Sequence, residues 1–163
     1  YQKSRILTFL NPERDPLGAG YQIIQSKIAI GSGGLFGKGF LNGSQSYLDY
    51  LPEKHTDFIY TLFSEEFGFF GSFFILLLYA LIIYRIIRIG NITRSNFGKL
   101  YCYGFGTAFF IYVVVNMMMV LGLLPIVGSP LPIMSYGGSS MMAIMFGLGI
   151  VMSCKIYKDV PVN

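Results

Sequence analysis

The side chains best suited to chemistry lie at the mouth of the first long apolar segment. If a helix begins near position 57, polar side chains spaced i, i+4, i+7 and i+8 share one of its faces: Asp57, Thr61, Ser64 and Glu65. Two carboxylates on one face at a membrane boundary can supply a general base and an electrostatic or metal-binding partner. The alternative is that Thr56 or Asp57 only caps the helix, because a negative charge suits a helix N-terminus. Spacing alone favours the cap.

The other reactive side chains do not form a familiar catalytic set. His55 is the only histidine, so no Ser–His–Asp triad and no multi-histidine metal site can be built without residues from elsewhere. Cys102 and Cys154 lie inside or beside apolar segments, which is typical of packing residues and excludes a disulfide framework. The stretch around Asp57 is therefore the richest in chemistry.

A glycine-rich stretch suggests a second kind of site, since residues 33–39 read GGLFGKG. A nucleotide-binding P-loop would need glycine at position 32 and serine or threonine at position 39, and Ser32 and Gly39 both fail this pattern. Two interpretations stay open. The stretch is a flexible turn, or its backbone N–H groups bind lipid headgroup phosphates together with Lys27 or Lys38.

The composition indicates what must position these residues. Of the 163 residues, 53% are apolar and only 12% are charged, against about 25% charged in a soluble domain. No charge occurs from Phe67 to Tyr84. These figures exclude a disordered chain, an ordinary soluble enzyme and a nucleic-acid-binding arm, and they predict an all-α integral membrane protein. Because the chain starts at Tyr1, we expect it to be the later part of a longer one.

Hydropathy and turn residues divide the chain into seven segments. We predict an extracytoplasmic loop with short helices, three transmembrane helices, a cytoplasmic loop, a re-entrant outer connection and a cytoplasmic tail. In chain order these are 1–57 (outer loop), 58–87 (helix), 88–99 (inner loop), 100–124 (helix), 125–138 (outer connection), 139–154 (helix) and 155–163 (tail).

Charges indicate the orientation of these spans. The region between the first two spans, from position 85 to position 99, and the C-terminal tail are rich in basic residues. These are Arg85, Arg88, Arg94, Lys99, Lys155 and Lys158. Cytoplasmic loops carry an excess of lysine and arginine, so both regions are predicted to be cytoplasmic.

The connection 125–138 is rich in proline and glycine and carries Ser135. Irregular backbone at membrane depth is tolerated only where protein buries it or it lines a cavity, which favours a re-entrant turn over a plain loop. In the span before it, Asn116 is expected to hydrogen-bond to a neighbouring helix. Buried polar groups such as Asn116, Glu65 and Glu66 imply more helices than this chain holds.

Several of these motifs resemble the SEDS family, the rod-shape, cell-division and sporulation membrane proteins of bacteria. They are Asn116 with residues 122–139, QSKIAIGSGGL at 25–35, LPEKHTDF at 51–58 and DPLGAGY at 15–21. The last two are most similar to the elongation branch, the RodA type. The likeness covers essentially the whole chain. It implies the last three transmembrane helices of a SEDS fold, preceded by the large extracytoplasmic loop.

The resemblance also implies a function. Members are peptidoglycan glycosyltransferases of the bacterial inner membrane that polymerise lipid II during cell elongation, maintain rod shape and release undecaprenyl pyrophosphate. Their implied partner is a class B penicillin-binding protein, the transpeptidase. The family's essential acid matches Asp57, which raises this residue from a cap to the leading catalytic candidate. The fragment alone is expected to be inactive.

The expected roles follow from this reaction. A sugar 4-hydroxyl must lose a proton as it attacks an anomeric carbon, and Asp57 would accept that proton. The leaving lipid pyrophosphate is negatively charged, so cations must offset its charge. Lys27 and Lys38 are the local candidates for substrate binding, with Glu65 and Ser135. A divalent cation, Mg²⁺ or Mn²⁺, is an alternative, and no organic cofactor is expected.

Two other functions remain open at this point. The Pro/Gly-broken connection also suits a transporter or flippase for lipid II. A non-catalytic scaffold for a transpeptidase is the third hypothesis, and it predicts that Asp57→Ala is silent.

Overall fold

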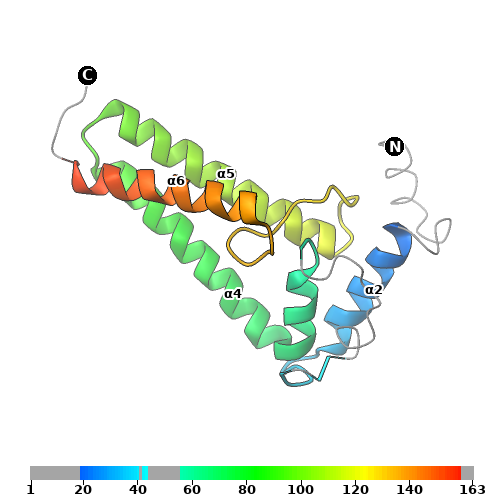
Figure 1. Ribbon diagram of the computed structural model, residues 1–163. Helices are drawn as coiled ribbons and strands as arrows, with labels where there is room; N and C mark the ends of the chain where they lie inside the picture. The colour runs from blue at the N-terminus through cyan, green and yellow to red at the C-terminus, as the bar shows by residue number, and fades with distance from the viewer. Residues whose placement is uncertain (1–18, 41, 44–55, 159–163) are drawn as a thin grey trace.

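The protein is all-helical throughout the part of the chain that the computed structural model describes, residues 19–40, 42–43 and 56–158. Figure 1 shows its four helices, α2 (Ala19–Ser32), α4 (Ile59–Ile92), α5 (Asn96–Val120) and α6 (Gly138–Ile156). α4, α5 and α6 are long and apolar enough to cross a membrane, which confirms the predicted fold class. Most of the predicted loop 1–57, including His55, lies outside the described residues.

The turn between the first two spans is much shorter than predicted. Only residues 93–95 separate α4 from α5, so the predicted loop 88–99 is mostly helix and that boundary was wrong. Arginine is a good helix former, and its long side chain carries the charge out of the apolar region, so basic residues do not end a helix. Ser95 caps α5, because its hydroxyl accepts a hydrogen bond from the Gly98 N–H at 3.5 Å.

The second span ends earlier than the predicted 100–124, since the last helical residue of α5 is Val120. Gly122 has a φ of 66°, in the left-handed region that commonly ends helices. The third span is slightly longer than the predicted 139–154, and it begins directly after the extended N-cap residue Gly137.

The first span is sharply bent, whereas the sequence predicted one span over 58–87. Gly68 has a φ of 67° and a ψ of −160°, which no helix accommodates. It divides α4 into a short arm before it and a long arm after it, visible as the bend in Figure 1. The long arm, residues 69–92, is about 36 Å long at 1.5 Å per residue, enough to cross the hydrocarbon core.

The glycine loop, residues 33–39, packs on this bend and supplies the hydrogen bonds that the bend leaves open. The Lys38 and Gly39 N–H groups donate to the carbonyl oxygens of Glu65 and Glu66, both at 3.0 Å. In return the N–H of Phe69 donates to the Gly34 carbonyl at 2.9 Å. Free backbone groups are costly in a membrane, so this loop stabilises the bend. Neither a flexible turn nor a phosphate cradle describes these amides, because five of them already donate to backbone carbonyl groups, namely those of Gly33, Gly34, Gly37, Lys38 and Gly39.

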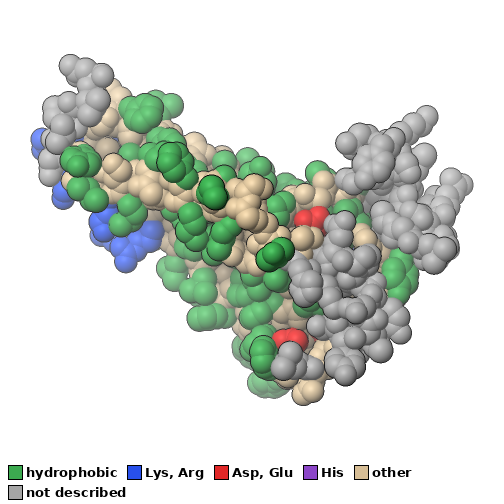
Figure 2. All heavy atoms as spheres, in the orientation of Figure 1, with side chains coloured by type: hydrophobic (Ala, Val, Ile, Leu, Met, Phe, Trp, Pro, Cys, Tyr) green, Lys and Arg blue, Asp and Glu red, His purple; other side chains and the backbone are tan. Residues whose placement is uncertain are grey.

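The long arm of α4 packs against α5, and two clusters of buried apolar side chains hold the helices together. Tyr79 of α4 and Phe109 of α5 are both buried, with ring centroids 6.0 Å apart. Outside this core the long helices expose many large apolar side chains, which cover much of the face in Figure 2. Exposed apolar surface of this extent is suited to lipid or to further helices and not to water.

Candidate functional site

Asp57 lies in a short turn, residues 56–58, that leads into α4. Its side chain is buried, and the next residue, Phe58, is fully buried and anchors the turn in the core. Phe58 is also the N-cap residue of α4, and it makes no side-chain capping bond. The interpretation of Thr56 or Asp57 as the N-cap is therefore wrong, because the N-cap position falls one residue after Asp57 and two after Thr56.

Asn116 fixes the backbone of this turn. Its amide Nδ2 donates to the carbonyl oxygen of Asp57 at 3.0 Å and to that of Ser129 at 2.7 Å. The predicted partner, a neighbouring helix, was wrong, since both acceptors are backbone carbonyls outside helices. One fully buried side chain on α5 thus ties the Asp57 turn to the connection between α5 and α6.

The connection reaches the same turn at a second point. The Ser135 hydroxyl donates to the carbonyl oxygen of Thr56 at 2.7 Å. The carboxylate of Asp57 faces the connection at Gly128, where an added Cβ would lie 3.4 Å from Oδ2. The Tyr79 hydroxyl holds the connection against α4 by donating to the Pro132 carbonyl at 2.5 Å. The irregular backbone of the connection is therefore packed against other parts of the protein beside the acid. Its re-entry into the membrane stays a prediction.

Several buried polar atoms in and around this site have no hydrogen-bond partner among the described residues. Three buried side-chain oxygens in the described part of the chain lack a hydrogen-bond partner, namely Thr61 Oγ1, Asn116 Oδ1 and Ser129 Oγ. Asn116 and Ser129 belong to the contacts that hold the turn. Buried polar atoms are normally paired, so this region is suited to a water molecule or a substrate hydroxyl. A groove of about 500 Å³ next to the turn is lined by Ile59, Ile133, Met134, Ser135, Tyr136 and Met141.

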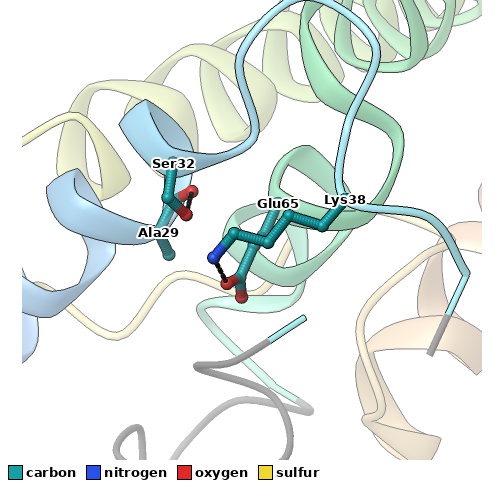
Figure 3. Close-up of polar contacts among 4 residues, drawn as sticks. All are labelled: Ala29, Ser32, Lys38 and Glu65. Atoms are coloured by element: carbon teal, nitrogen blue, oxygen red, sulfur yellow. Dashed lines mark hydrogen bonds and ion pairs between the residues drawn. The ribbon is translucent and has the colours of Figure 1, made fainter. Parts of the chain in front are cut away.

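Glu65 has a different environment from Asp57. Its fully buried carboxylate pairs with the Lys38 ammonium at 2.7 Å, as Figure 3 shows. Asp57 precedes α4, whereas Glu65 lies six residues after the first helical residue, Ile59, about 9 Å along the helix axis. The two carboxylates were predicted to form one pair on a shared helix face. They lie instead in different environments, since Asp57 belongs to the turn and Glu65 forms an ion pair near the bend of α4.

Lys27, the other predicted cation, lies on α2 at the end of α5. Its exposed side chain covers Gly122, where an added Cβ would lie 2.8 Å from Nζ. The preceding residue, Ser26, donates to the Val120 carbonyl at 2.9 Å and fixes α2 there. A cation at a helix C-terminus is favourable, because the last carbonyl groups carry partial negative charge.

The described residues contain no group of three or more metal-ligating side chains. Asp57 can supply one carboxylate, and Mg²⁺ is commonly bound by one or two carboxylates together with substrate phosphates. The residues of the turn are compatible with such a shared site, and the divalent cation stays a prediction.

Comparison with known proteins decides the family. The family model described as "Cell cycle protein", which covers FtsW, RodA and SpoVE, matches residues 1–159. The chain belongs to this family. Peptidoglycan glycosyltransferase MrdB of Escherichia coli K12 is 52% identical over 97% of the chain. RodA of Treponema pallidum is 47% identical over 94%, and stage V sporulation protein E of Bacillus subtilis is 43% identical over 97%.

Solved structures share the fold of this FtsW/RodA/SpoVE chain. One, described as the structural coordination of polymerization and crosslinking by a peptidoglycan synthase complex, has a TM-score of 0.75 at 38% identity and covers 98% of this chain and 43% of that one. An aspartate-to-alanine mutant of rod shape determining protein RodA from Thermus thermophilus has a TM-score of 0.65 at 32% identity, over 77% of this chain and 39% of that one. The chain spans 43% of the length of MrdB and 35% of that of the Treponema RodA.

Several residues that hold the site together could not be assigned this role from the sequence, and some of them stood out in the sequence more than others. Asn116 stood out as a polar residue in an apolar span, but its partners lie 59 and 13 residues away in sequence. Tyr79 gave no signal, because an apolar helix holds many similar residues. Gly128 belongs to the 122–139 motif, but nothing in the sequence distinguished it from the other glycines there.

Proposed function

We propose that the full-length protein is a peptidoglycan glycosyltransferase that polymerises lipid II during cell elongation and maintenance of rod shape. The observation that carries the proposal is the buried Asp57 turn, held by Asn116 and Ser135 from two other segments. A turn that only started a helix would not need both contacts. The names of the relatives, peptidoglycan glycosyltransferases MrdB and RodA, support this reaction.

Asp57 acts as the general base. Its carboxylate accepts the proton of a sugar 4-hydroxyl while that oxygen bonds to the anomeric carbon of a second lipid-linked glycan. The bond from this carbon to the lipid pyrophosphate breaks with its electron pair, and undecaprenyl pyrophosphate leaves. Fixing the turn through backbone contacts holds the base in position, and good positioning lowers the entropic barrier.

The remaining predicted site residues take supporting roles. Lys27 is an exposed cation that can offset the charge of the pyrophosphate. Lys38 holds the bend through Glu65, so we assign both residues to positioning the short arm of α4. Ser135 positions the turn through Thr56. A divalent cation bound at Asp57 would add positive charge at the leaving group.

The proposed setting follows the family. The protein would cross the bacterial inner membrane several times with its C-terminus in the cytoplasm, where the basic ends of α4 and α6 belong by the positive-inside rule. Its proposed partner is a class B penicillin-binding protein. The fold match to a structure of a peptidoglycan synthase complex that coordinates polymerization and crosslinking supports this partner.

The test uses the full-length protein in detergent with purified lipid II, where there is no membrane to cross. We expect glycan strands from the wild type and none from Asp57→Ala, with equal membrane insertion of the two proteins. Glu66→Gln is a matched control, since Glu66 is a partly exposed acid on the same short arm.

Each alternative predicts a different result in this assay. A lipid II transporter would form no glycan in detergent. If the protein is a scaffold, a mixture of the protein and its partner should polymerise lipid II equally well with the wild type and with Asp57→Ala. The reason is that a scaffold contributes no base to the reaction.

A further inference from the structure

A second polar cavity lies at the other end of the helices, remote from the Asp57 turn. It has a volume of about 280 Å³ and lies between the ends of α4 and α6. Its lining consists of four cations and two apolar side chains, namely Arg85, Arg88, Lys155, Lys158, Ile89 and Ile92. Figure 2 shows the basic side chains of the visible face gathered at this end. This set is called the basic pocket below.

The positive charge of the basic pocket is not balanced within the described structure. The described acids, Asp57, Glu65 and Glu66, all belong to the turn and the short arm of α4, at the far end of that helix. The one ion pair found among the described residues joins Lys38 to Glu65. Like charges that line one cavity repel one another, so the basic pocket is suited to an anion.

The position of these cations along the membrane-spanning helices indicates which kind of anion the basic pocket binds. Arg85 and Arg88 lie 16 and 19 residues after Phe69, about 24 and 28 Å along the long arm. Lys155 lies 17 residues after Gly138, about 26 Å along α6. Since the hydrocarbon core is about 30 Å thick, three cations from two helices reach the same membrane boundary, where lipid phosphates lie.

The apolar part of the lining fits the same ligand. Ile89 and Ile92 stand between the cations, so the pocket offers charge on one side and apolar surface on the other. Arginine binds phosphate through paired N–H groups, and basic pockets between cytoplasmic helix ends bind anionic lipid headgroups. A small soluble anion would gain nothing from the isoleucines.

We propose that the basic pocket binds the headgroup of an anionic phospholipid of the surrounding membrane. The phosphate lies between the arginines of α4 and the lysines at the end of α6 and just after it, Lys155 and Lys158, and the acyl chain runs along the isoleucines. The bound lipid offsets the repulsion among the four cations and joins the ends of two helices. This site is independent of the glycan chemistry proposed for Asp57.

The test measures lipid binding by the full-length protein in detergent, with native mass spectrometry and dioleoylphosphatidylglycerol as the probe. Arg88→Gln combined with Lys155→Gln removes one cation from each helix. We expect about 25-fold weaker binding of one lipid, from roughly fivefold for each charge. The control combines Arg94→Gln with Lys99→Gln, because these exposed cations lie at the same end but do not line the pocket. It should change binding less than twofold.

Further arms make the result decisive. Dioleoylphosphatidylcholine should bind weakly and equally to all variants, and Arg88→Lys should keep most of the affinity. The thermal unfolding midpoint of the wild type, but not of the pocket variant, should rise with phosphatidylglycerol, while both unfold cooperatively. Equal losses in the pocket and control variants, no loss in either, or displacement of the lipid by millimolar inorganic phosphate would each overturn the proposal.

Discussion

Asn116 shows how one side chain can position a reactive group that it does not touch. Its two donated hydrogen bonds end on the backbone of Asp57 and of Ser129, so they fix the direction of the chain at the acid and not the carboxylate itself. We therefore regard Asn116 as a positioning residue. Loss of its amide would loosen the turn while leaving the acid present.

Asn116→Leu should reduce the turnover number for lipid II polymerisation about 10- to 100-fold, because two hydrogen bonds of about 1 kcal/mol each no longer hold the turn. The KM for lipid II should change little. The comparison variant is Asn91→Leu, at an exposed asparagine near the end of α4. Equal turnover numbers for the two variants would remove Asn116 from the account.

For the Lys38–Glu65 ion pair we predict that substitutions change the stability of the protein and not its turnover number. Lys38→Met removes the ammonium that pairs with a fully buried carboxylate, and should lower the free energy of unfolding by about 3 kcal/mol. Lys38→Met combined with Glu65→Leu should recover most of this loss, because the buried charge is removed together with its ammonium partner. Unfolding in mixed micelles with increasing dodecyl sulfate measures the free energy of unfolding of the single and the double variant. A double variant less stable than Lys38→Met would contradict the assignment.

At the scale of elements, the bend of α4 and the glycine loop depend on each other. The bend exposes backbone groups that only a close-fitting loop can reach, and glycine on both sides allows this approach. An added Cβ at Gly68 would lie 2.3 Å from the Gly37 nitrogen, inside any allowed contact. The bend orients the short arm, and the Asp57 turn at its start.

Gly68→Ala should therefore lower the free energy of unfolding by about 3 kcal/mol or more, through backbone strain and this clash. Gly104→Ala is the matched control, because an added Cβ there meets nothing within 4 Å and alanine favours the helix. The two variants are compared by thermal unfolding in detergent. A Gly68→Ala protein as stable as Gly104→Ala would show that the bend is not required.

The same elements show where sequence reasoning works. The all-α class and its membrane-spanning helices were predictable, because an uncharged apolar stretch of about 18 residues or more is typical of a helix that crosses a bilayer. The bend at Gly68 was not, since a lone glycine in an apolar run is usually tolerated within a straight helix. The shared site of Asp57 and Glu65 failed for a different reason. The i, i+8 spacing assumes a helix that begins at the acid, whereas Asp57 lies in a turn and α4 begins only at Ile59.

At the scale of the whole molecule, the charged side chains of the described residues lie toward the two ends of the long apolar helices. One end holds Asp57 and the proline- and glycine-rich connection, and the other holds the basic pocket. Between them, α4 and α6 bury little of their surface, so lipid or further helices must cover the rest. We assign the proposed glycan chemistry to the Asp57 end and to that carboxylate.

The most direct test of this claim is the steady-state polymerisation of lipid II by the full-length Asp57→Asn protein, with its transpeptidase partner present. The amide matches the carboxylate in shape but cannot accept the proton. We predict a turnover number at least about 100-fold below the wild type, with a KM for lipid II within a few-fold. A turnover number within threefold of the wild type would contradict the assignment of Asp57 as the base.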